Sequence, residues 1–148
     1  MNRTISISLL VLAFVLGFLT FYWHGPKPTP VQGSSVAGTQ QTWETKIDDQ
    51  ENVSVVVTPI DLSPQSAEWK FDVGMNTHSV ELDQDMSKVA VLIDEQGKEY
   101  KPLAWTGPTG GHHREGTLTF ARITPTPKSV TLKITGIADV VRSFVWQP

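Results

Sequence analysis

Residues 68–75 read EWKFDVGM, and this stretch decides the fold class. Apolar side chains occupy alternate positions, with charged residues or glycine between them. Successive side chains of a β-strand point to opposite faces, so a period of two predicts a strand with one buried and one solvated face. The residues expected to face the core are Trp69, Phe71, Val73 and Met75.

Short segments with the same character follow one another through the rest of the chain, separated by turn residues. Gly97 is expected to adopt a positive φ in a hairpin loop, and Gly136 to mark a bulge or a bend. About seven to nine short strands predict an all-β, immunoglobulin-like antiparallel β-sandwich, with a small closed barrel as the alternative. Besides the opening stretch, the predicted strands are 53–57, 88–93, 100–105, 117–122, 130–135 and 139–146.

A second stretch, ISISLLVLAFVLGFLTFYW at residues 5–23, carries no charge. A helix of this length rises about 28 Å, close to the thickness of the hydrocarbon core of a bilayer. Aromatic residues 21–23 suit the membrane interface, and Gly25 and Pro26 would end the helix. We therefore predict a transmembrane signal-anchor helix at 5–23. A cleaved signal peptide is the alternative, although it has a shorter apolar core and a nearby small-residue cleavage site.

This anchor sets the expected organisation of the chain. Arg3 favours a cytoplasmic N-terminus at residues 1–4. Residues 24–41, rich in Pro, Gly and Ser, read as a linker. The β-sandwich at 42–148 is then an extracytoplasmic domain of a single-pass protein in the cell membrane.

Composition narrows the function classes. The chain has a formal net charge of -3, and no basic patch interrupts its acidic C-terminal part, which argues against nucleic acid as a partner. Cysteine is absent, so no disulfide and no lipid-modified cysteine is expected. No nucleophile elbow, phosphate loop or His-Glu-x-x-His motif occurs, so we expect a protein that is not an enzyme.

Two stretches at 76–86 and 105–116 contain three of the four histidines. Gly110 and Gly111 permit backbone shapes that other residues avoid, which would present His112 and His113 on an unusual loop. Imidazole and thioether groups suit copper, and imidazole suits zinc. One hypothesis is therefore a copper or zinc site, provided that the two stretches lie at the same end of the sandwich. Its candidate ligands are His78, His112, His113, Met75, Met86, Asp83 and Glu115.

Other interpretations of these residues compete with a metal site. His78 could cap a turn, and Arg114 could form a surface ion pair with Glu115. Adjacent histidines in an extended segment also tend to point apart, and no complete ligand spacing is present. We therefore expect no cofactor as the first interpretation. Glycan stacking is a further possibility if Trp43, Trp105 and Trp146 are exposed, although such residues more often fill a sandwich core.

The segment from Trp69 to Phe120 contains Thr77-His78-Ser79-Val80-x-Leu82-Asp83 and Gly110-Gly111-His112-His113-Arg114-x-Gly116. In these motifs it resembles a set of uncharacterised prokaryotic secreted or membrane-anchored β-domains, which implies a domain type. A sandwich with His and Met in loops is more distantly similar to periplasmic copper carriers of the CopC-like kind. The amino-terminal His typical of that copper site has no counterpart in this sequence.

Together these observations predict a non-enzymatic interaction or structural role in the cell envelope. The N-terminal helix would contact the membrane. Another envelope protein would bind through the loop end of the sandwich or through an exposed edge strand.

Overall fold

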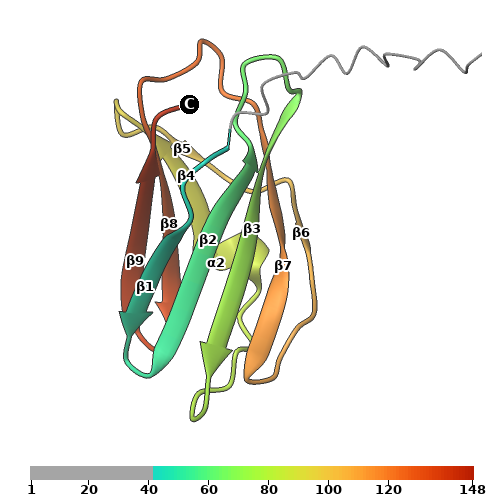
Figure 1. The fold of residues 1–148 in the computed structure, drawn as a ribbon, viewed down its shortest axis with the longest axis vertical. Coiled ribbons are helices and arrows are strands. Elements are labelled where there is room, and N and C mark those ends of the chain that lie inside the picture. The colour runs from blue at the N-terminus through green and yellow to red at the C-terminus, as the bar shows by residue number, and fades with distance from the viewer. Residues whose placement is uncertain (1–41) are drawn as a thin grey trace, which may run out of the picture. The chain divides into compact units, whose positions relative to one another are not determined.

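The computed structural model describes residues 42–148, which form two antiparallel sheets packed face to face (Figure 1). One sheet has the order β1-β2-β3-β7-β6 and the other β5-β4-β8-β9. The β-sandwich prediction is therefore confirmed. The elements are β1 Lys46–Gln50, β2 Val53–Asp61, β3 Glu68–Thr77, α2 Met86–Val89, β4 Ala90–Asp94, β5 Glu99–Tyr100, β6 Ala104–Thr106, β7 His113–Ala121, β8 Val130–Ile137 and β9 Val140–Trp146.

The predicted anchor at 5–23 and linker at 24–41 lie outside the described residues. Between residues 42 and 148, no helix is long and apolar enough to cross a membrane.

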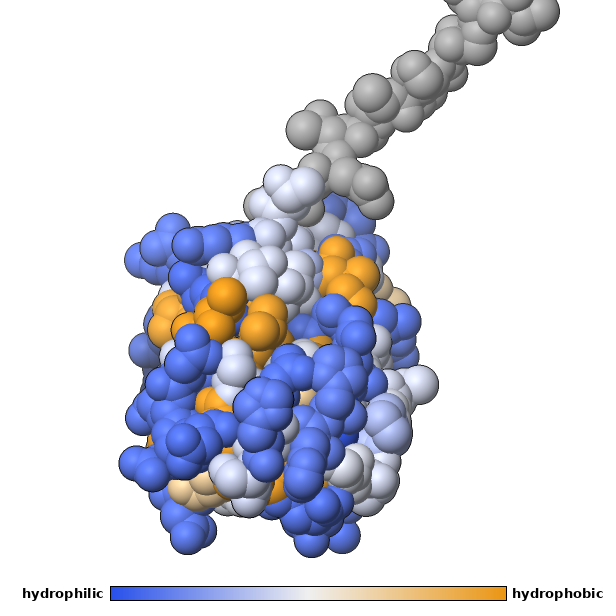
Figure 2. Space-filling model, turned by 60° about the horizontal axis from the view of Figure 1, so that its bottom comes forward, coloured by the Kyte–Doolittle hydropathy of each residue, from blue (hydrophilic) through white to orange (hydrophobic). Residues whose placement is uncertain are grey.

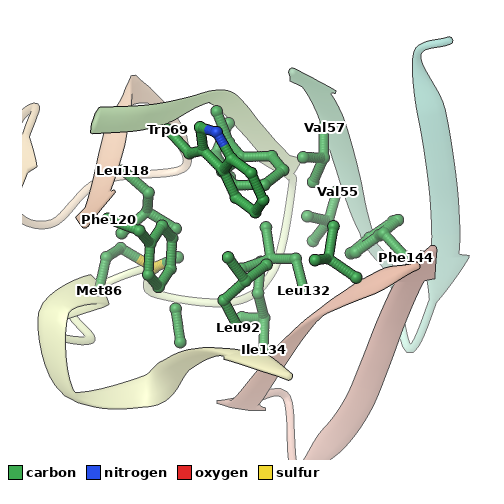
Figure 3. Packing of buried hydrophobic residues seen from close by; sticks show 14 of the residues in the cluster. Val55, Val57, Trp69, Met86, Leu92, Leu118, Phe120, Leu132, Ile134 and Phe144 are labelled. Carbon is green, nitrogen blue, oxygen red and sulfur yellow. The ribbon is translucent and has the colours of Figure 1, made fainter. Parts of the chain in front are cut away.

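The core lies between the two sheets and is built from alternate residues of the central strands (Figure 3). In β3 the four predicted inward residues, Trp69, Phe71, Val73 and Met75, are each 0% exposed. The Phe71 and Phe120 rings meet edge to face, with centroids 5.8 Å apart. Burial of such side chains stabilises the fold by roughly 1.5–3 kcal/mol each. The alternation at residues 68–75 thus places one face of β3 in the core.

The predicted strand at 100–105 is wrong, because the chain changes sheets within it. β5 ends at Tyr100 in one sheet, and β6 begins at Ala104 in the other. Pro102, which has no amide hydrogen to donate to a strand ladder, lies in the crossing.

The predicted strand at 88–93 begins later than expected, because residues 86–89 form the single-turn helix α2. The Asp85 side chain accepts a hydrogen bond from the Ser87 amide and caps this turn. β4 then lies between β5 and β8, inside its sheet.

Strand β1 was not predicted, because its sequence KIDDQ is largely polar. It forms by pairing with β2 across the two-residue turn Glu51-Asn52, whose φ angles are 48° and 60°. Along one side of the sandwich β1 faces β9, and the indole N–H of Trp146 donates to the Glu44 carbonyl at 2.7 Å.

The opposite side of the sandwich is edged by β5 and β6, which are two and three residues long. Short edge strands offer little backbone for another chain to pair with. Edge-strand binding of a partner is therefore less favoured at these two edges, whereas the other two edge strands, β1 and β9, have five and seven residues.

Several connections gather at one end of the sandwich, opposite the end where residue 42 enters and residue 148 leaves (Figure 1). We call this the loop end and define it by residues 49–54, 76–84, 107–113 and 137–141. The amide of Thr77 donates to the carbonyl of His112 at 2.9 Å, so the two histidine-bearing stretches share this end.

Candidate functional site

The two histidine-bearing loops are joined by backbone hydrogen bonds beyond the ends of β3 and β7. The Leu82 amide donates to the Gly111 carbonyl, and the Gly110 amide donates to the Leu82 carbonyl, both at 3.1 Å. The Glu81 carboxylate accepts the amide of Gly111. Gly110 and Gly111 have φ angles of 84° and 96°, a region that favours glycine. The glycine pair thus lets the loop turn back against Glu81 and Leu82.

Arg114 lies beneath these loops and is 1% exposed. Its guanidinium donates to the carbonyls of Leu82 at 2.8 Å, Gln84 at 2.9 Å and Pro108 at 3.0 Å. Desolvation by burial lowers the pKa of Arg114, and the charges of nearby aspartates partly oppose this shift. Arg114 is therefore an internal fastener of the loops, and the expectation of a surface ion pair with Glu115 is wrong.

Trp105 covers Arg114, and its ring centroid lies 5.6 Å from the guanidinium carbon. The indole also lies against the backbone of Gly107 and Gly116. A Cβ at Gly116 would come within 2.6 Å of both the indole and the Thr106 carbonyl oxygen. The indole can lie here because neither glycine has a side chain.

A second buried arginine, Arg142, is 0% exposed and lies at the same end. Its guanidinium donates to the carbonyls of Ile137 at 2.8 Å and Gln50 at 2.9 Å, with a longer contact to Val53 at 3.5 Å. Its Nε also lies 3.1 Å from the Asp48 carboxylate, without hydrogen-bond geometry.

The carbonyls that Arg142 binds flank the two-residue turns at 51–52 and 138–139. All four turn residues have positive φ although none is glycine. This conformation costs free energy in non-glycine residues, so the contacts around Arg142 help to hold both turns in place.

Neither arginine was predicted to be buried. The available signal was the strand period: Arg114 shares its face with Leu118, and Arg142 shares its face with Phe144. A charged residue normally lies at the surface, and this expectation outweighed the alternation along the strands, which places both arginines on the buried face.

The structure does not bring the predicted metal ligands together. Met75 and Met86 are 0% exposed in the core, whereas Glu115 lies on the outer face of β7, opposite Gly74. Asp83 is exposed in the loop that follows β3. Alternation along a strand sends such residues to opposite faces. Among residues 42–148, no group of three or more His, Cys, Asp or Glu side chains is placed to hold a metal ion.

The two adjacent histidines point to different partners, as expected for an extended segment. Nδ1 of His113 contacts Oδ1 of Asn76 on the outer face of the sheet. Nε2 of His112 lies 3.9 Å from the carboxylate of Glu81.

His78, the third candidate histidine, lines an open hollow of about 340 Å³. This hollow lies between the β1–β2 turn and the end of β3, and it is formed by residues 49–54 and 76–78. We call it the hairpin hollow. Asp49 and Glu51 are among its lining residues, which include no Lys or Arg. Figure 2 brings the loop end forward and shows a mostly hydrophilic surface with scattered apolar patches.

Of the three tryptophans considered for glycan stacking, one lies in the core and two pack against it. Trp146 is 5% exposed, and Trp43 and Trp105 are partly buried and pack against the core cluster. This agrees with the interpretation of these residues as packing residues.

No family model matches the sequence, and the comparison with curated proteins finds no match. Among solved structures, the chain is similar to MPT63, a secreted protein from Mycobacterium tuberculosis, with a TM-score of 0.42 and 16% identity over 71% of this chain and 92% of that one. It is also similar to a DUF4426 family protein from Pseudomonas aeruginosa, with a TM-score of 0.40 and 10% identity over 70% of this chain and 92% of that one. Likenesses of this degree carry no information about a ligand of this chain.

Proposed function

We propose that this protein is a single-pass, membrane-anchored extracytoplasmic module with a non-enzymatic interaction role in the cell envelope. Its loop end would bind another envelope protein. The observation that carries the proposal is the fastening of two irregular loops by Arg114 at the end remote from residue 42. A loop surface that is already ordered loses less conformational entropy when it binds a partner.

The position of the loop end supports the same role. Residues 42 and 148 both lie at the other end of the sandwich (Figure 1). A tether that enters at residue 42 leaves the loops accessible to a partner. Binding residues are often found on loops that a rigid scaffold positions.

We further infer that the sandwich is immunoglobulin-like. Without β1, the sheets have the orders β2-β3-β7-β6 and β5-β4-β8-β9. These correspond to strands A-B-E-D and C′-C-F-G of immunoglobulin domains. Strand β1 is then an addition at the edge of the first sheet.

The test is photo-crosslinking in cells of the source organism, with a photoreactive amino acid at Asp83 or Thr109. Both positions are exposed at the loop end, and neither residue is bound by Arg114. Gln65 and Thr126, exposed in connections at the opposite end, are the matched controls. We expect a discrete protein adduct from the loop-end positions alone. Equal adducts from the controls, or none from the loop end, would refute the proposal.

Copper or zinc binding by the histidine loops is the second candidate. Its supporting observation is that the loops share an end, with His112 and Glu81 3.9 Å apart. Calorimetric titration with Cu(I), Cu(II) and Zn(II), with His112→Ala beside the native chain, separates the two candidates. Micromolar binding that the substitution abolishes would favour a metal site.

A further inference from the structure

The chain leaves the β1–β2 turn with the sequence Asn52-Val53-Ser54. An asparagine followed two positions later by serine or threonine, with a residue other than proline between them, is the acceptor pattern for an N-linked oligosaccharide. Because the pattern is short, its meaning depends on where it lies in the fold. A modified asparagine needs a surface position on a domain that has crossed the membrane.

Asn52 lies where an enzyme can reach it. It is exposed, and it is the second of the two residues that turn the chain from β1 into β2. Its φ of 60° lies in the left-handed region, which asparagine tolerates better than most residues other than glycine. β2 begins at Val53, which is 1% exposed, and alternation along the strand then turns Ser54 to the outer face of the sheet. The amide of the pattern and its hydroxyl are thus both accessible from solvent.

The two polar side chains of the pattern are not engaged by the rest of the domain. Among residues 42–148, the side chains of Asn52 and Ser54 take part in no hydrogen bond. The turn is held through its backbone instead, because Arg142 donates to the carbonyls of Gln50 and Val53. A sugar attached to Asn52 would therefore break no contact of the fold.

The hairpin hollow provides space beside Asn52. Asn52 and Ser54 both line this open hollow of about 340 Å³. The surface next to the turn is therefore recessed, and an attached oligosaccharide has room there.

We propose that Asn52 is an N-glycosylation site. This inference rests on the extracytoplasmic location in the proposed function. The donor is an oligosaccharide linked through phosphate to a polyisoprenyl lipid, and the catalyst is a membrane-bound oligosaccharyltransferase of the cell. The amide nitrogen of Asn52 forms a bond to the anomeric carbon of the first sugar, while the C–O bond from that carbon to the lipid-linked phosphate breaks. The phosphate leaves with the electron pair, and the amide proton passes to a base of the transferase.

The test is peptide mass mapping of the full chain purified from membranes of the source organism. Trypsin cleaves after lysine and arginine, so residues 47–70 form one peptide, in which Asn52 is the only asparagine. We expect this peptide to carry the added mass of an oligosaccharide on Asn52. A native peptide that has only the mass of its sequence would overturn the proposal.

Variants at the two ends of the pattern separate N-linked modification from any other. Asn52→Gln removes the acceptor, and Ser54→Ala removes the hydroxyl while Asn52 remains. We expect both variants to lose the added mass and Ser54→Thr to keep it, because threonine also completes the pattern. Added mass that survives in Ser54→Ala would contradict the assignment.

Asn76→Gln is the matched control. Asn76 is exposed and lines the same hollow, but the residue two positions later is His78, which has no hydroxyl. The peptide 47–70 should carry the same mass in this variant as in the native chain. Loss of the added mass in Asn76→Gln would mean that access to the hollow, and not the acceptor pattern, governs the modification.

The N-terminus contains a second copy of the pattern, Asn2-Arg3-Thr4, in the segment expected to lie in the cytoplasm. Added mass on Asn2 in place of Asn52 would reverse the orientation of the chain and contradict both the proposed function and this inference. An unmodified Asn52, together with loop-end adducts in the crosslinking experiment, would remove this inference and leave the proposed function intact.

Discussion

Arg114 and Arg142 are two buried arginines whose positive charges have different surroundings. Both are buried at the loop end, and both donate to backbone carbonyls of three residues. Arg142 also has the carboxylate of Asp48 beside it, whereas Arg114 has the ring of Trp105. Beside the shared carbonyl contacts, Arg114 therefore packs under an aromatic ring, whereas Arg142 lies next to a carboxylate.

The two arginines also connect different parts of the molecule. Arg142 extends from β9 to β1 and β2 of the opposite sheet. Arg114 extends from β7 to two loops. When these loops open, the carbonyls that Arg114 binds can form hydrogen bonds with water. We therefore expect Arg142 to contribute to global stability and Arg114 mainly to the order of the loops.

The largest effect is expected for Arg142→Met, which removes the side-chain hydrogen bonds to three carbonyls and leaves Asp48 without its cation. Breaking a buried pair typically costs about 3–5 kcal/mol, and the Asp48 side chain is 21% exposed, so we expect about 3 kcal/mol. Urea unfolding followed by tryptophan fluorescence measures the loss.

Asp48→Asn is the control for the contribution of the counter-ion. It retains an oxygen beside Arg142 and removes the charge, so its cost is expected to be smaller than that of Arg142→Met. A loss below about 1 kcal/mol for Arg142→Met itself would contradict the role assigned to this arginine.

Arg114→Met is expected to cost about 2 kcal/mol, because the freed loop carbonyls regain water once the loops open. The diagnostic change is local. Hydrogen exchange of the Leu82, Gly110 and Gly111 amides should accelerate more than that of β3. Uniform acceleration throughout the domain would instead place Arg114 in the same class as Arg142.

Gly116→Ala tests how tightly Trp105 packs against the backbone of β7. The added Cβ meets a backbone oxygen and the indole at 2.6 Å, so we expect a loss of about 1.5 kcal/mol. Gly74→Ala, on the neighbouring strand, is the matched control, because its Cβ meets only Val56 at 4.0 Å. The control should be neutral or slightly stabilising. Similar effects at both positions would mean that Trp105 shifts to accommodate the added Cβ at little cost in stability.

The smallest effect is expected at Asp72, a charge that lies on the outer face of the sheet. Desolvation, and secondarily the charge of Glu115, raises the pKa of Asp72 in the folded state. The folded state therefore holds this proton more tightly, and the ionised carboxylate disfavours folding at neutral pH.

Asp72→Asn should accordingly stabilise the domain at pH 7, on the order of 0.5 kcal/mol. The gain should vanish as the pH falls below the usual aspartate value of 3.8, where the native carboxyl is protonated in both states. Unfolding free energies across this pH range check the prediction, and a gain that persists in acid would contradict it.

Much of the sandwich could be predicted from local pattern alone. The alternation at 68–75 placed β3 correctly, and Gly97 has the predicted positive φ, at 82°. A register shift occurs between Ile134 and Ile137, where the bulge was expected. These features depend on neighbours in sequence, which is why the sequence shows them.

The candidate site depends on neighbours in space and was less accessible. Arg114 binds Leu82, 32 positions away, and Arg142 binds Gln50, 92 positions away. Strand β1 likewise owes its conformation to β2 and not to its own polar residues. No local period reports such contacts, so their discovery required the fold.

The pairing of β1 with β2 has a mechanical consequence. A pull between residue 42 and a partner held at the loop end acts along the length of β1. The ladder of hydrogen bonds between Lys46–Gln50 and Val53–Val57 would then be loaded in shear, with its bonds sharing the force. Such a joint resists extension better than one that opens bond by bond.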